Sequence, residues 1–168
     1  EDFDTIERQV NIAKANADVV IVSCHWGYED TNEINDLQRE VADRLNIMGV
    51  DVIIGTHPHV IQTVEWHTND VNDNKTLICY SLGNFISTQA KPDQLVGALL
   101  TVKLEKTTEP DGTVHCTVLD PRLWPTVTHY DAGKSNVRTY LLQDYTAALA
   151  QAHGVRNDYP DFSLEWIR

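Results

Sequence analysis

Three histidines occupy positions in which a protein could hold a metal ion. His25 follows the first of two short apolar runs, and His57 and His59 follow the second. In α/β proteins, ligands bind beyond the carboxyl ends of buried strands, so the three rings could meet at one edge of a sheet. Imidazole suits borderline divalent metals, and two histidines in an extended turn around the rigid Pro58 can point to the same side. On spacing alone, the competing interpretation is three structural histidines with ordinary hydrogen bonds.

The elements that must position these histidines alternate between helix and strand over residues 1–60. Apolar residues at steps of three and four predict amphipathic helices over residues 4–17 and 34–48. Unbroken β-branched runs at residues 19–22 and 50–54 predict strands that are buried on both faces of a parallel sheet. This alternation is typical of a βαβ unit, so the predicted fold class is α/β with right-handed crossovers.

Beyond the paired histidines, the pattern changes to antiparallel β structure across residues 61–130. The strand-like segments, separated by polar or Gly/Pro-rich stretches, are residues 61–67, 76–85, 97–105 and 113–118. A last helix is predicted over residues 135–154, and an irregular surface tail over residues 155–168. Because the 168 residues contain no internal repeat or clear linker, a single domain is expected over residues 1–168.

Composition limits the partners that the chain can bind. The formal net charge is −12, from 13 basic and 25 acidic residues, so we expect no nucleic-acid partner. No apolar run approaches the ~20 residues of a membrane span, and no secretory signal is visible. Three cysteines without CxxC spacing indicate neither a disulfide framework nor a zinc knuckle. The chain starts at Glu1 and its only methionine is Met48, so we expect a piece of a longer protein.

Three sequence blocks resemble those of a known family. Residues 23–29 read SCHWGYE, residues 55–62 read GTHPHVIQ, and residues 80–85 read YSLGNF. Together they resemble the HWGxE, GxHPHVxQ and YSLGNF blocks of CapA-type capsule (poly-γ-glutamate) synthesis proteins, over roughly residues 5–153. The resemblance implies an α/β fold that is the C-terminal part of a metallophosphoesterase-like (calcineurin-like) two-sheet sandwich flanked by helices.

The resemblance also implies roles for the histidines. In the wider superfamily, a histidine after a strand and a paired-histidine turn supply metal ligands, which here match His25, His57 and His59. By this analogy His25 and His57 share one divalent metal ion (Mn, Fe or Zn), and His59 reaches a second. The remaining ligands, including a carboxylate that bridges the two metals, would come from an N-terminal half that precedes this chain. We therefore expect the chain alone to bind metal incompletely and to be inactive.

Other residues of the blocks have two interpretations each. Trp26 packs either beside the site or in the core, and Glu29 either orients His25 or is a solvated loop carboxylate. Gln62 is interpreted as structural. Three residues of the last block could either bind substrate or hold the histidine turn: Ser81, Gly83 and Asn84.

Two functions in capsule biosynthesis remain open from the sequence. In the first, His25, His57 and His59 are catalytic metal ligands of a hydrolase or transferase that acts on an ester or amide of the capsule polymer. In the second, a non-catalytic module binds or exports poly-γ-glutamate within the capsule synthase complex. A third possibility is a piece without activity of its own. The family implies a location at the bacterial cell surface, with anchoring through the N-terminal part.

Self-association is a further expectation. Strands that are apolar on both faces, as at residues 19–22 and 50–54, need neighbours on either side. Where a neighbour is lacking, a sheet edge stays exposed, and the identical edge of a second copy is always available to cover it. The sequence therefore predicts a dimer or a strand-exchanged oligomer that forms beside residues 19–22.

Overall fold

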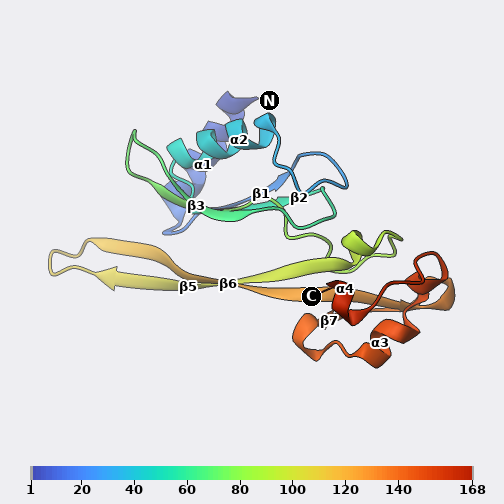
Figure 1. The fold of residues 1–168 in the computed structure, drawn as a ribbon. Coiled ribbons are helices and arrows are strands. Elements are labelled where there is room, and N and C mark those ends of the chain that lie inside the picture. The colour runs from blue at the N-terminus through green and yellow to red at the C-terminus, as the bar shows by residue number, and fades with distance from the viewer. Residues whose placement is uncertain (1, 168) are drawn as a thin grey trace.

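Two β-sheets stacked face to face form the centre of the computed structural model, which describes residues 2–167 (Figure 1). The first sheet has four strands in the order β1-β2-β4-β3. Their bounds are Ile21–His25 for β1, Val52–Thr56 for β2, Val64–Thr68 for β3 and Lys75–Cys79 for β4. β1, β2 and β4 are parallel, and β3 is antiparallel to β4. The segment 61–130 thus contributes two strands to the sheet that residues 1–60 begin.

Two helices cover the outer face of the first sheet (Figure 1). The Asp2 side chain caps α1 (Phe3–Asn16), and Asn35 forms a capping box with Gln38 at the start of α2 (Asp36–Ile47). Both helices bury their apolar faces against the sheet. The core between them and the sheet consists of Val10, Val20, Trp26, Ala42, Leu45, Val50, Ile53, Ile78 and Tyr80.

The second sheet is antiparallel, with the order β5-β6-β7. β5 spans Val96–Thr108, β6 spans Val114–Asp131 and β7 spans Ser135–Leu141. The core between the two sheets is formed by Val52, Leu77, Cys79 and Val118, and burial raises the pKa of the Cys79 thiol to about 12. The predicted two-sheet sandwich with flanking helices is confirmed. Among the described residues, no helix is long and apolar enough to cross a membrane.

β1 lies at the edge of the first sheet and packs on one face only. Val22 and Cys24 contact the helical core, whereas Ile21 is 53% exposed. The predicted burial of residues 19–22 on both faces therefore fails at Ile21, although Val19, just before β1, packs against the core between the sheets. Within residues 2–167, β2 is the only strand that pairs with β1, so β1 has the position of an edge strand despite its apolar sequence. β2 is buried on both faces, as predicted for the strand near residues 50–54.

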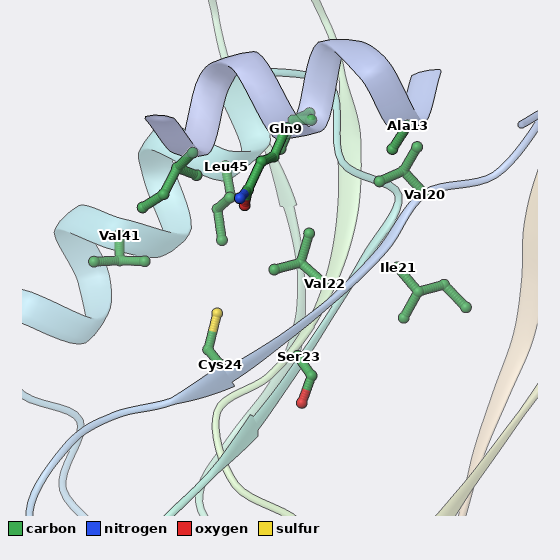
Figure 2. A pocket seen from close by; sticks show the side chains of 11 residues that line it. Gln9, Ala13, Val20, Ile21, Val22, Ser23, Cys24, Val41 and Leu45 are labelled. Carbon is green, nitrogen blue, oxygen red and sulfur yellow. The ribbon is translucent and has the colours of Figure 1, made fainter. Parts of the chain in front are cut away.

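A groove of about 430 Å³ opens between α1, α2 and the unpaired edge of β1. Figure 2 shows Val22 and Cys24 pointing from β1 toward the helices, while Ser23 points to the opposite side. Val41 and Leu45 of α2 and several residues of α1 complete the lining. Within residues 2–167, the groove thus places apolar side chains beside the outer edge of β1, which no strand covers.

The helix predicted over residues 135–154 is wrong over most of its length. Its first seven residues form β7, and α-helix is confined to α3 (Ala147–Ala152). Val137, Thr139 and Tyr140 are β-branched or aromatic residues that favour a strand, and pairing with the long β6 decides against the helical spacing. The segment therefore completes the second sheet.

The C-terminal tail is more ordered than the irregular segment expected over residues 155–168. It contains α4 (Leu164–Ile167), and Phe162 is buried against the ring of His153, with ring centroids 5.0 Å apart. His153 and His129 are buried, and burial lowers the pKa of both imidazoles, so they are core histidines. The short 3₁₀ turns of the chain are Pro92–Leu95 (η1), Ala132–Lys134 (η2), Leu142–Asp144 (η3) and Gly154–Asn157 (η4).

Candidate metal centre

The paired-histidine turn follows directly on β2. His57 and His59 both have positive φ angles, of 101° and 63°, so the turn is a double bend and not the extended turn expected from the sequence. A residue with a Cβ is strained in this region, and a residue before proline is additionally restricted to extended conformations. The fold therefore holds His57 in a costly conformation, and such strain tends to gather at functional sites.

The structure brings the three predicted histidines together. β1 and β2 are parallel with His25 opposite Thr56, so the chain leaves both strands at the same edge of the sheet. The ring centroids of His25 and His57 are 4.6 Å apart, and those of His57 and His59 are 6.0 Å apart. This convergence follows from the parallel pairing that the sequence predicted.

Glu29 joins the histidines from the loop after β1. Its Oε1 atom lies 3.6 Å from Nε2 of His59. One ligand atom from each of Glu29, His57 and His59 lies within 4.8 Å of the other two, and His25 stands beside this group of three. The sequence suggested that Glu29 could orient His25. In the structure, Glu29 contacts His59 instead.

Several bonds fix the loop that carries Glu29. The backbone N–H of Asp30 donates to the Pro58 carbonyl at 2.9 Å, which ties the loop to the histidine turn. The Asp30 carboxylate accepts a hydrogen bond from Lys91 at 2.5 Å, and this bond lowers the pKa of Asp30. Buried Gln62 donates to two carbonyl groups of the loop and accepts from Gln38 of α2, which agrees with the structural role predicted for Gln62.

The three candidate residues of the YSLGNF block divide into two roles. Asn84 contacts a histidine, because its Oδ1 lies 3.0 Å from Nδ1 of His59. Ser81 is buried, and its hydroxyl accepts from the Gly83 N–H at 3.2 Å. Gly83 pairs with Gly97 of β5, and a Cβ on either glycine would meet the backbone of the other segment. Ser81 and Gly83 therefore hold the turn, and Asn84 reaches the site.

Trp26 belongs to the core. Its side chain is 8% exposed, its indole N–H donates to the Tyr80 carbonyl at 2.8 Å, and the two rings stack with centroids 5.7 Å apart. Gly55 of β2 lies directly against this bond. Trp26 thus fixes the end of β1 from which the chain turns toward Glu29.

Thr56 is a contact of His25 that the sequence did not single out. Its Oγ1 lies 3.3 Å from Nδ1 of His25 and donates to the Cys24 carbonyl at 3.1 Å. The parallel register of β1 and β2, which puts these two residues opposite each other, is the signal that could have identified it.

The donors in this cluster are imidazole nitrogens and one carboxylate. This combination suits borderline divalent ions such as Zn²⁺, for which mixed histidine and carboxylate ligand sets are common. The cluster lies at the carboxyl ends of adjacent parallel strands, where α/β proteins bind their ligands.

Two stacked sheets with flanking helices, and a cluster of metal-binding side chain types at the strand ends, are consistent with a fragment of a calcineurin-like fold. The chain belongs to the bacterial capsule synthesis protein family PGA_cap, whose sequence model matches residues 1–89. It is 40% identical over 97 residues to "PGA biosynthesis protein CapA" of Bacillus subtilis (strain 168). It is also 37% identical over 90 residues to "Capsule biosynthesis protein CapA" of Bacillus anthracis.

These alignments cover 58% and 51% of this chain. They cover 24% and 20% of the two relatives, so the aligned part of the chain corresponds to a quarter or less of their length. All the candidate site residues lie within the region that the family model matches.

Proposed function

We propose that this chain acts in bacterial capsule biosynthesis through a divalent-metal site formed by Glu29, His57 and His59, with His25 beside them. The observation that carries the proposal is the convergence of three ligand atoms from two separate turns within 4.8 Å. The strained φ of 101° at His57 adds support, because the fold would not retain a costly turn without a use for the ring.

The residues present fit a single borderline divalent ion. Glu29, His57 and His59 would hold it, and the ion would supply Lewis-acid polarisation of an ester, amide or phosphate oxygen, as expected of a hydrolase or transferase. Glu29 contributes the negative charge, and His25 extends the set of donors on the β1 side. The loop bonds of Asp30 and Gln62 keep the Glu29 carboxylate near the histidines.

The proposed substrate is the anionic capsule polymer, poly-γ-glutamate, or a component of its synthase. The relatives are named for PGA and capsule biosynthesis, which supports a role of the chain at the bacterial cell surface. The chain has a net charge of −12, so a polyanion would meet repulsion over most of its surface. A bound cation is therefore the natural point of contact for a carboxylate-bearing polymer.

Calorimetric titration of the metal-free protein with Zn²⁺ tests this proposal. We expect one weakly bound ion per chain, and Glu29→Gln should lower the affinity at least about 10-fold because it removes the charged ligand. Glu33→Gln, which makes the same change in the same loop, should bind as the wild type does. Absence of heat from the wild type, or equal affinity of the two variants, would contradict the metal site.

Self-association through β1 is part of the proposal. In a parallel pair, the N–H and C=O of one residue point to the same side of the strand. The Val20 carbonyl and the Trp26 N–H bond to β2 or its flanks, so the odd-numbered Ile21 and Ser23 direct their backbone groups outward. These groups and the adjacent groove form an edge that a second copy could cover.

Analytical ultracentrifugation should accordingly show dimers of the wild-type chain. Ser23→Pro removes one outward N–H without removing a ladder bond to β2, so it should shift the equilibrium toward monomer. Ser23→Ala keeps that N–H and should remain dimeric. A wild type that sediments as a monomer at tens of micromolar would rule out this pairing.

A further inference from the structure

The metal-binding nitrogen of a histidine depends on its tautomer. A neutral imidazole carries one N–H, and only the ring nitrogen without the proton can bind a metal ion. At His25 and His59, Nδ1 makes a side-chain contact, with Thr56 and Asn84 as the respective partners. The other bonds of these two partners decide where each ring proton lies.

The hydroxyl oxygen of Thr56 directs a lone pair at Nδ1 of His25. A threonine hydroxyl has one proton, and Thr56 donates it to the Cys24 carbonyl at 3.1 Å, a group that can only accept. In that arrangement the same oxygen, 3.3 Å from Nδ1 of His25, accepts a hydrogen bond there. Nδ1 of His25 therefore carries the ring proton, and Nε2 is bare.

Asn84 imposes the same tautomer on His59. Its Nδ2 donates to the backbone carbonyl of Gln94 at 3.0 Å and to Oε1 of Gln89 at 2.6 Å. Because a backbone carbonyl can only accept, the amide nitrogen must face it, which turns Oδ1 toward His59. Nδ1 of His59, 3.0 Å from this oxygen, therefore donates.

The consequence is visible at Glu29. When the His59 ring is neutral, its bare Nε2 faces the Glu29 carboxylate oxygen 3.6 Å away, so two acceptors face each other without a donor between them. A cation placed between them would remove this repulsion. The tautomer of His59 and the position of Glu29 thus match the same ligand.

We propose that Thr56 and Asn84 are positioning residues that hold His25 and His59 as Nδ1–H tautomers, so that each presents Nε2 for metal binding. The purpose of this arrangement rests on the proposed metal site, but the tautomers are a property of the metal-free protein. They oppose the preference of a solvated imidazole for the Nε2–H form. Within the described residues, the His57 ring makes no side-chain hydrogen bond. Its tautomer therefore serves as an internal comparison for those of His25 and His59.

A long-range ¹H–¹⁵N correlation spectrum of the metal-free, ¹⁵N-labelled protein at about pH 8, above the ordinary imidazole pKa of about 6.5, tests the tautomers. Protonated and bare ring nitrogens have well-separated ¹⁵N shifts. We expect Nδ1–H at His25 and His59. Thr56→Val should shift His25 toward the Nε2–H tautomer and leave His59 unchanged. Asn84→Leu should shift His59 toward Nε2–H and leave His25 unchanged. Thr56→Ser keeps the hydroxyl and should keep the wild-type tautomer of His25.

Zn²⁺ titration gives a second readout. Thr56→Val and Asn84→Leu should each lower the affinity about 10- to 100-fold, as is usual for partners that orient a ligand, and Thr56→Ser should not. Nε2–H at either histidine of the wild type, or an unchanged His25 in Thr56→Val, would overturn the assignment. If a variant fails to fold, the spectra of the wild type and Thr56→Ser still decide. If His25 and His59 have the expected tautomers but the protein binds no Zn²⁺, the proposed metal function is wrong and the tautomer assignment is still correct.

Discussion

Replacement of Gly55 by alanine should lower the free energy of unfolding by about 3 kcal/mol, because overpacking and a broken buried hydrogen bond each cost about 1–3 kcal/mol. A Cβ at this position would overlap the Tyr80 carbonyl oxygen and the Trp26 indole nitrogen, which are the two partners of a buried bond. Both partners belong to the core, and the nearer atom is backbone, so neither can move aside cheaply.

Urea denaturation of Gly55→Ala and Gly112→Ala measures this effect against a matched control. A Cβ on Gly112 meets no atom within 4 Å, but its φ of 88° is unfavourable for alanine, so a loss of only about 1 kcal/mol is expected there. In a Trp26→Phe background the difference should shrink by the contribution of the indole hydrogen bond, about 1–3 kcal/mol, while the overlap with the Tyr80 carbonyl oxygen remains. Equal destabilisation by the two alanine variants would show that the indole contact is not tight.

The position of the histidines could be predicted because it depends on a general property of parallel sheets. Two apolar runs that end next to His25 and His57 become neighbouring strands, and neighbouring parallel strands end at one edge. No knowledge of side-chain contacts is needed for that step. The family blocks then identify which of the seven histidines belong to the site.

The contact of Glu29 with His59 could not be predicted in this way. It requires the loop to turn at Gly27 and Asp30, both with positive φ, and to bond to the Pro58 carbonyl. These features depend on backbone conformations that single residue types allow but do not dictate. Thr56 was missed for a similar reason, and the sequence left the role of Asn84 open, since both roles depend on the direction of individual hydrogen bonds.

Two of the fold predictions that failed also depend on distant contacts. Residues 135–141 have helical spacing of apolar residues, yet β6 offers them a strand partner and the pairing prevails. The run at residues 19–22 is apolar enough for a central strand, but the burial of a strand depends on how many neighbours it has, which its own sequence does not state.

Replacement of His57 by glycine should weaken metal binding and stabilise the metal-free protein at the same time. Loss of a direct ligand should lower Zn²⁺ affinity by more than the roughly 100-fold upper range for an orienting partner. A backbone held at a φ of 101° costs a residue with a Cβ about 1–3 kcal/mol, and glycine avoids this cost. The greater freedom of glycine in the unfolded chain offsets about 0.4–1 kcal/mol, so a net gain near 1 kcal/mol is expected.

His57→Ala separates the ring from the backbone. It should lose metal binding as His57→Gly does, but it keeps the Cβ and therefore the strain, so its unfolding midpoint in urea with chelator should not exceed that of the wild type. If the glycine and alanine variants are equally stable, the turn is not strained. If either variant keeps wild-type Zn²⁺ affinity, His57 is not a ligand. If His57→Gly alone is more stable than the wild type while both variants bind Zn²⁺ more weakly, the strained turn lowers stability but holds the His57 ring at the metal site.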